Sequence, residues 1–209
     1  AATIEGGFKR DTGAFRFDAT AYYTRYRGFI YRQLTGARCD DDIASCGAGT
    51  ELDQVIFSQK DATFHGVELA GEVDVGRVSG GVWGIAGRYD HVRARFEDGE
   101  NVPRIPPHRL GGGLYYRDGA WRARVDLLHA FRHDETAPEE TATSGYTLLN
   151  AEVSYTMTPA AGGAIMPKLT IGLKGENLLD DDVRNSASFK KDEVLQPGRN
   201  VRLYGIVRF

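Results

Sequence analysis

The chain has 209 residues, of which 41% are hydrophobic and 11% aromatic, and its formal net charge at pH 7 is −3. This length fits one domain, and a slightly acidic chain gives no reason to expect a nucleic-acid partner. No apolar run reaches the length of about 18 residues that a transmembrane helix needs, whereas a membrane-spanning β-strand needs only about 9–11 residues with every second one apolar. Residues 1–10 lack the charged start and apolar run of a signal peptide, so we expect the chain to be a fragment of a longer exported protein.

The predicted elements are β-strands, because apolar and polar residues alternate along the chain with a period of two. In the segment 13–26, Phe15 and Phe17 fall on one face, while Arg16 and Asp18 fall on the other. The same alternation recurs down to the end of the chain. It predicts nine strands, at 3–10, 13–33, 52–75, 80–97, 107–118, 121–134, 144–158, 167–183 and 199–209.

The alternation also predicts which side chains share a face, since a one-residue shift would invert both faces of a strand. One face is predicted to be apolar and to meet lipid; it includes Val67, Leu69, Val125, Leu127, Val153, Tyr155 and Leu203. The other is predicted to be a hydrated, charged lumen wall; it includes Arg16, Asp18, Glu68, Glu72, Asp74, Arg88, Arg122, Arg124, Asp126, Glu152, Lys174, Glu176, Arg202 and Arg208.

The connections between these strands alternate in length. Short turns are expected at 10–13, 76–80, 117–120 and 159–166, and longer polar segments at 34–51, 98–106, 135–143 and 184–198. In an antiparallel meander, alternate connections lie at the same end of the sheet. Short turns at one end and long loops at the other are typical of outer-membrane β-barrels.

A soluble β-sandwich is the alternative that also fits a two-faced strand pattern. Several predicted strands exceed the usual length of about 5–6 residues more than twofold. Aromatic residues gather near predicted strand ends, as Tyr115, Tyr116 and Trp121 do, where membrane interfaces favour them. Both features favour the membrane barrel.

Several segments resemble one family when taken in order. The stretch 174–185 (KGENLLDDDVRN), the loop end 196–200 (QPGRN) and a last strand that stops at an aromatic residue resemble the C-terminus of TonB-dependent receptors. The segments 58–69 (SQKDATFHGVEL) and 102–110 (VPRIPPHRL) are similar to internal elements of the same family.

The resemblance implies an all-β, antiparallel up-and-down transmembrane barrel of 22 strands in the outer membrane of a Gram-negative bacterium. Residues 1–209 would form its last nine strands, and the plug and the first thirteen strands would be absent. Phe209 would act as the assembly signal that the β-barrel assembly machinery recognises. The other partners implied are outer-membrane lipid and the TonB–ExbB–ExbD complex, which would act through the plug.

The implied function is active import of a metal ion or metal chelate. Segments 58–69 and 102–110 are most similar to zinc-uptake receptors, and ferric siderophore import is the commoner family function. A passive pore or structural barrel is the alternative reading. The sequence has no nucleophile elbow, phosphate loop or metal-ligand quartet, so neither an enzyme nor a bound cofactor is expected.

Two cysteines lie seven residues apart in one predicted external loop. We expect Cys39 and Cys46 to form a disulfide, since an exported protein folds in an oxidising compartment. The alternative is a metal site that uses both thiolates together with Asp40, Asp41 and Asp42.

Polar residues near the predicted outer ends of strands are the candidates for substrate binding. They are Asp90, His133, Asp134 and Glu135. On one strand, His129 and His133 would lie about 13 Å apart. This distance is too long for both to bind one ion unless the strand bends. Surface residues above the lipid band are the simpler interpretation of these histidines, and the metal-ligand set stays unknown.

Overall fold

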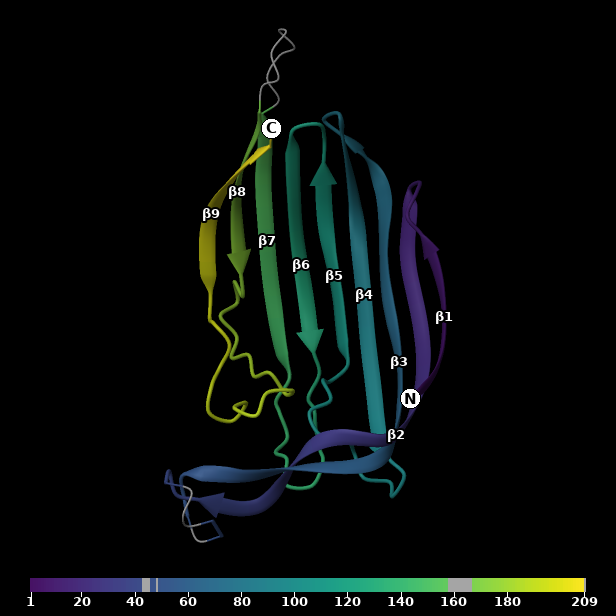
Figure 1. Ribbon diagram of the computed structural model, residues 1–209. Helices are drawn as coiled ribbons and strands as arrows, with labels where there is room; N and C mark the ends of the chain where they lie inside the picture. The colour runs from purple at the N-terminus through teal and green to yellow at the C-terminus, as the bar shows by residue number, and fades with distance from the viewer. Residues whose placement is uncertain (43–45, 48, 158–166, 209) are drawn as a thin grey trace.

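The computed structural model describes residues 1–42, 46–47, 49–157 and 167–208. These residues form nine strands in a single antiparallel sheet, in which each strand pairs with its neighbours in the sequence (Figure 1). Among the described residues there is no helix long and apolar enough to span a membrane. The strands are β1 (Ala2–Arg10), β2 (Phe15–Cys39), β3 (Leu52–Val78), β4 (Gly81–Phe96), β5 (Arg109–Arg117), β6 (Trp121–Ala130), β7 (Tyr146–Met157), β8 (Lys168–Glu176) and β9 (Asn200–Arg208).

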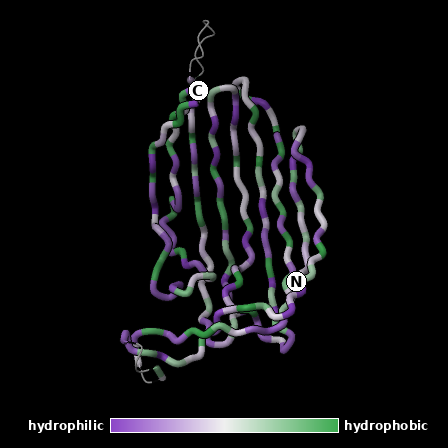
Figure 2. The backbone as a smooth tube through the Cα atoms, viewed as in Figure 1, coloured by the Kyte–Doolittle hydropathy of each residue, from purple (hydrophilic) through white to green (hydrophobic). Residues whose placement is uncertain are grey.

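The pairing register confirms the predicted division into two faces. Residues directly opposite each other in an antiparallel ladder lie on the same face. One apolar row crosses five strands, through Val73, Ile85, Leu114, Val125 and Ala151. Hydropathy alternates along the strands in the corresponding way (Figure 2).

The charged residues form rows on the opposite face. Arg124 pairs with Glu152, which pairs with Lys174, which in turn pairs with Arg202. Side chains on this face also meet over intervening strands: Arg124 on β6 lies 2.7 Å from Glu72 on β3. Such contacts require the face to be concave, so the charged side is the inner side of a curved wall.

Within the described part of the chain, no second layer packs on the apolar face. Ile4 on β1 and Leu203 on β9 are 79% and 75% exposed. The hydrophobic core is small and lies at one end of the sheet, where it is made by Tyr31, Ala62, Ala94, Phe96 and Val102. The sheet is therefore a single layer whose convex side presents hydrocarbon to its surroundings.

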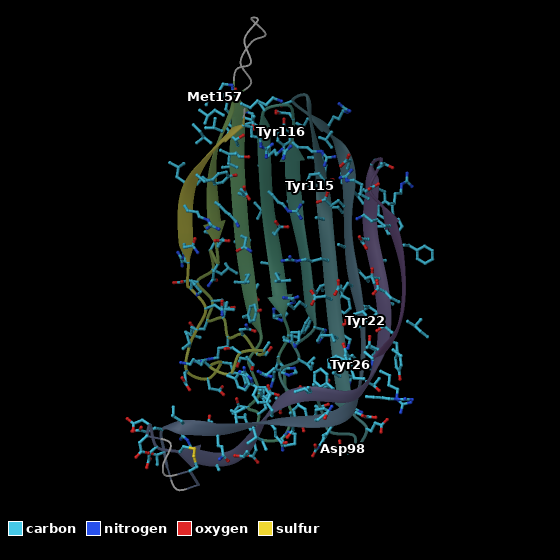
Figure 3. The ribbon with its side chains drawn as sticks, in the orientation of Figure 1. Tyr22, Tyr26, Asp98, Tyr115, Tyr116 and Met157 are labelled. Atoms are coloured by element: carbon cyan, nitrogen blue, oxygen red, sulfur yellow. A yellow bond between two sulfur atoms is a disulfide. The ribbon has the colours of Figure 1, made fainter. Side chains whose placement is uncertain are left out.

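The two ends of the sheet differ as predicted. Short turns at 11–14, 79–80 and 118–120 lie at one end, together with Tyr116, and the segments 97–108, 131–145 and 177–199 lie at the other (Figures 1 and 3). The predicted turn at 159–166 and the terminal residue Phe209 lie outside the described residues.

The longest hairpin, formed by β2 and β3, extends beyond the other strands and bends across their loop-bearing end (Figure 1). The bend follows a register shift between Tyr26 and Phe29. Between them Gly28 has a φ of 67°, a value that side chains disfavour, and its N–H donates to the Asp61 carboxylate at 2.7 Å. The sequence prediction ended β2 at residue 33, six residues before its observed end at Cys39.

Two other strands end well before their predicted ends. β8 ends at Glu176 rather than at 183, because Asn177 and Asp180 take positive φ values of 49° and 59°. The Asn177 N–H donates to the Asn150 side chain on β7, which fixes the turn. β6 ends at Ala130 rather than at 134, so His133 is not on that strand.

Candidate functional site

The loop-bearing end is fixed by its small core and by ion pairs around it. The rings of Tyr31 and Phe96 lie 4.5 Å apart, and the Lys60 ammonium reaches both Asp98 and Glu100 at 2.7 Å. The hydrogen bond from Lys60, followed by the backbone N–H of Glu100, lowers the pKa of Asp98. These contacts join the hairpin to the 97–108 loop (Asp98 is labelled in Figure 3).

A first cleft at this end, here called the histidine cleft, has a volume of about 350 Å³. Its lining includes His91, His108, His133, Asp134 and Glu135. His133 is buried, and its Nε2 has no hydrogen-bond partner among the described residues; the same holds for Nδ1 of His91. Burial lowers the pKa of His133, which favours the neutral imidazole, the form that can accept a hydrogen bond or bind a metal.

His133 takes its position from its backbone. Its N–H donates to the Thr143 carbonyl at 2.9 Å, and the Thr143 N–H donates back at 2.8 Å. Two residues further along the loop, the carboxylate of Glu135 forms an ion pair with the Arg93 guanidinium at 2.5 Å. The structure thus brings together three of the four sequence-predicted substrate residues, although they come from a loop rather than from a strand end.

Asp90, the fourth predicted residue, does not reach the histidine cleft. It lies on the inner face of β4 and accepts a hydrogen bond from Arg109 at 2.8 Å. It lines an adjacent hollow that also contains Glu68. Among the described residues, no group of three or more His, Cys, Asp or Glu side chains is arranged to hold a metal ion.

Cys39 and Cys46 form the predicted disulfide, with an S–S distance of 2.17 Å. It closes the tip of the β2–β3 hairpin (yellow bond in Figure 3). A disulfide sulfur is not a thiolate, so the alternative of a metal site that uses both cysteines does not match this structure.

A second cleft lies between the hairpin and three loops and has a volume of about 360 Å³; it is called here the arginine cleft. Arg32 of β2, Arg104, Glu140, Phe189 and Lys191 are among its lining residues. The Arg104 guanidinium carbon lies 3.8 Å from the centre of the Phe189 ring. Sequence reasoning missed this cleft, because its residues come from separate polar segments of the chain.

The inner wall carries a dense polar network nearer the short-turn end. Arg16 contacts Glu72 at 3.2 Å, Asp74 at 2.8 Å and the Tyr115 hydroxyl at 2.9 Å. Most of these groups are already paired with one another. The network therefore pairs most of these charges on the inner wall. Among the described residues, the buried side-chain atoms without a hydrogen-bond partner are His91 Nδ1, Arg104 Nε and His133 Nε2, and these residues line the two clefts.

Comparisons with known proteins agree with this arrangement. The sequence model of one family, described as "TonB dependent receptor-like, beta-barrel", matches residues 1–178. Among solved structures, "Copper transporter OprC" has a similar fold, with a TM-score of 0.73 and 17% sequence identity. The similarity covers 99% of this chain and 30% of that protein, so the chain spans less than a third of the transporter's length.

Proposed function

We propose, because this chain belongs to the family of TonB-dependent receptor-like β-barrels, that residues 1–209 form the last nine strands of a 22-stranded barrel in the outer membrane of a Gram-negative bacterium. The complete protein imports a metal ion or a metal chelate with energy from the TonB–ExbB–ExbD complex. A plug domain outside this chain contacts that complex.

The observation that carries this proposal is the curved sheet with one apolar and one charged face. Val125 and its row neighbours present hydrocarbon on the convex side, while Arg124 and Asp126 lie on the concave side. A barrel wall between lipid and a water-filled lumen requires this division. The strands β1 and β9 are edges in this chain, and unpaired backbone groups in hydrocarbon are costly, which supports further strands that close the barrel.

The end assignment follows from loop length. The short turns lie in the periplasm and the long loops outside the cell, as in other outer-membrane barrels. Substrate then arrives at the end that holds both clefts. In this proposal His133, Asp134 and Glu135 contact it in the histidine cleft, and Asp90 contacts it further along the inner wall.

Zinc and ferric siderophores are both compatible with this arrangement. The Nε2 atom of His133, an imidazole nitrogen without a hydrogen-bond partner among the described residues, is suited to zinc or copper. OprC is described as a copper transporter, which supports a metal as cargo.

Metal uptake by whole cells tests the proposal. Cells that produce the full-length protein receive radioactive zinc as the free ion, and radioactive iron as anionic chelates. We expect accumulation above a vector control, and its loss in cells without TonB. Equal uptake with and without TonB would instead support the alternative, a passive outer-membrane pore; no uptake in either strain would leave a structural barrel.

A further inference from the structure

Positive charges gather at the short-turn end of the sheet, the end where Tyr116 and Met157 are labelled in Figure 3. Five cationic residues each lie at the end of a strand or one residue from it. Together they are called here the basic rim, which comprises Arg77, Arg117, Arg122, Lys168 and Arg208. The rim extends from β3 to β9, so it follows most of the wall.

The pairing register places like charges of the rim directly opposite each other. Arg117 on β5 pairs with Arg122 on β6, and Lys168 on β8 pairs with Arg208 on β9. Arg77 lies in the same row as Arg117, with Val82 of β4 between them. Directly opposite side chains have Cβ atoms only about 5 Å apart, and like charges in this position destabilise a sheet. The rim is therefore unfavourable for the fold unless anions share it.

Nearby carboxylates do not supply those anions. Within the described part of the chain, Arg117 is the one rim residue with an ion pair, at 2.9 Å from Asp74. Arg16 shares that carboxylate at 2.8 Å. Asp118 lies beside the rim, but one of its oxygens accepts two backbone N–H groups of its own turn, at 2.7 and 2.6 Å. Four of the five rim cations thus have no carboxylate among the described residues.

The other acidic residues near this end lie beside further cations. Asp18 is 3.5 Å from Lys9, and Asp11 follows Arg10 in the β1–β2 turn. The segment 158–166, between β7 and β8, has neither Asp nor Glu in its sequence. The positive charge at this end consequently exceeds the negative charge.

Most cations deeper on the inner wall are paired. Arg124 lies 2.7 Å from both Glu72 and Asp126, and Lys174 lies 2.8 Å from Glu176. The excess charge is therefore concentrated at the opening of the wall and not along it. A binding partner for the rim would approach from the compartment that this end faces.

The direction of the rim side chains favours a protein over a lipid headgroup as that partner. Arg122 lies two residues from Arg124 and so shares its inner face, as Lys168 shares the inner face of Lys174. Trp121 lies on the opposite, apolar face, where it is 48% exposed. Lipid meets the apolar face, whereas the rim meets water.

We propose that the basic rim docks an acidic surface, rich in aspartate and glutamate, of a soluble periplasmic protein. The inference rests on the proposed function, which places the short turns in the periplasm. Opposite charges at exposed positions steer association and set orientation. A partner held at the rim lies at the periplasmic opening of the barrel, where imported cargo emerges.

Binding of a fluorescent hexaglutamate peptide to the purified full-length protein tests the rim, with hexaglutamine and hexalysine as comparison peptides. Hexaglutamate should bind more tightly than either, and its binding should weaken as salt is raised. The rim variant Arg77→Gln/Arg122→Gln/Lys168→Gln should weaken it by about tenfold, or roughly twofold for each charge, as expected for exposed ion pairs. Arg208 stays unchanged because it precedes Phe209, the expected assembly signal.

The matched control is Arg27→Gln/Arg38→Gln/Arg132→Gln, which removes the same charge from exposed arginines at the loop-bearing end. It should leave hexaglutamate binding unchanged, and heat-dependent gel mobility should show that both variants form intact barrels.

Three results would overturn the proposal. The first is no binding of hexaglutamate to the original protein, as expected if a plug neutralises the rim. The second is equal binding by the rim variant and the control. The third is phosphatidylglycerol that native mass spectrometry finds retained by the control but lost from the rim variant, which would assign the rim to lipid.

The peptide measurement needs neither TonB nor a membrane potential. Hexaglutamate binding that depends on the rim, without TonB-dependent uptake, would sustain the docking surface and refute the import function. TonB-dependent uptake by a protein whose rim binds no hexaglutamate would do the reverse.

Discussion

Asp74 on β3 accepts hydrogen bonds from Arg117 on β5 at 2.9 and 3.0 Å, over the intervening strand β4. The same carboxylate also receives the Tyr115 hydroxyl at 2.6 Å. A sheet that curves toward this face brings such side chains closer together. They lie on the concave face and join β3 to β5 near the short turns.

We expect Asp74→Asn to lower the thermal unfolding midpoint of the full-length protein, because two arginines on the inner wall would lose their shared anion. Asp18→Asn is the control: the Asp18 side chain is 51% exposed and lies 3.5 Å from Lys9, whereas that of Asp74 is 20% exposed. Heat-dependent gel mobility measures both midpoints. A fall of the same size in both variants would show that the network does not support the wall.

Lysine substitutions on the two faces should have opposite consequences. Val125→Lys places a charge on the apolar face in the middle of β6, where such a change costs about 2–4 kcal/mol at the bilayer midplane. Thr20→Lys places it on the inner face, directly opposite Glu68 on β3, and should be tolerated. Urea unfolding in lipid vesicles compares them; equal destabilisation would argue against the assignment of faces.

Two adjacent glycines on β5 test how closely the side chains pack on each face of the sheet, because an alanine substitution adds only one methyl group. A Cβ at Gly113 would lie 2.5 Å from the Asp126 carboxylate and 2.6 Å from the Val125 carbonyl, whereas at Gly112 the nearest atom, the Ala86 carbonyl oxygen, is 3.4 Å away. We expect Gly113→Ala to destabilise the protein by about 1–3 kcal/mol, as overpacking does. Gly112→Ala should be close to neutral, and the urea midpoints of the two variants should separate accordingly.

Acidification should loosen the 131–145 loop. Because burial lowers the pKa of His133, the opened loop binds a proton more readily than the closed one, and closure loses stability as the pH falls below the ordinary histidine pKa of about 6.5. Glu140, Glu135 and Asp134 partly oppose this shift, and Lys191 adds to it.

Hydrogen exchange of the loop between pH 7.5 and 5.5 measures the effect. Exchange, corrected for its intrinsic pH dependence, should rise toward pH 5.5 in the original protein and in His65→Gln, whose histidine is exposed on β3. It should stay level in His133→Gln. A rise that persists in His133→Gln would assign the acid sensitivity to another group.

Period-two alternation was sufficient to predict the nine strands and both faces, because each strand has one apolar and one charged side. It could not predict the bend at Gly28 or the end of β8 at Asn177, since both depend on bonds to distant residues, Asp61 and Asn150. The position of Asp90 on the inner face followed from the alternation of faces along its strand. Its separation from His133, in contrast, depends on how the loops fold.

The arginine cleft is the larger gap in prediction. Arg32, Arg104 and Phe189 lie more than seventy residues apart in sequence from one to the next, and no local pattern marks a guanidinium as unpaired. Only the folded loops show which arginines have carboxylate partners.

Spin-label accessibility along β6 tests the central claim most directly. Single labels at positions 122–127 of the full-length protein in lipid bilayers, with Cys39 and Cys46 replaced by serine, report collisions with oxygen, which concentrates in lipid, and with a polar nickel chelate, which stays in water. The barrel account predicts high oxygen accessibility at 123, 125 and 127 and less at 122, 124 and 126, where water in the lumen would give the nickel chelate access instead. The inverse pattern, or no alternation along the strand, would contradict it.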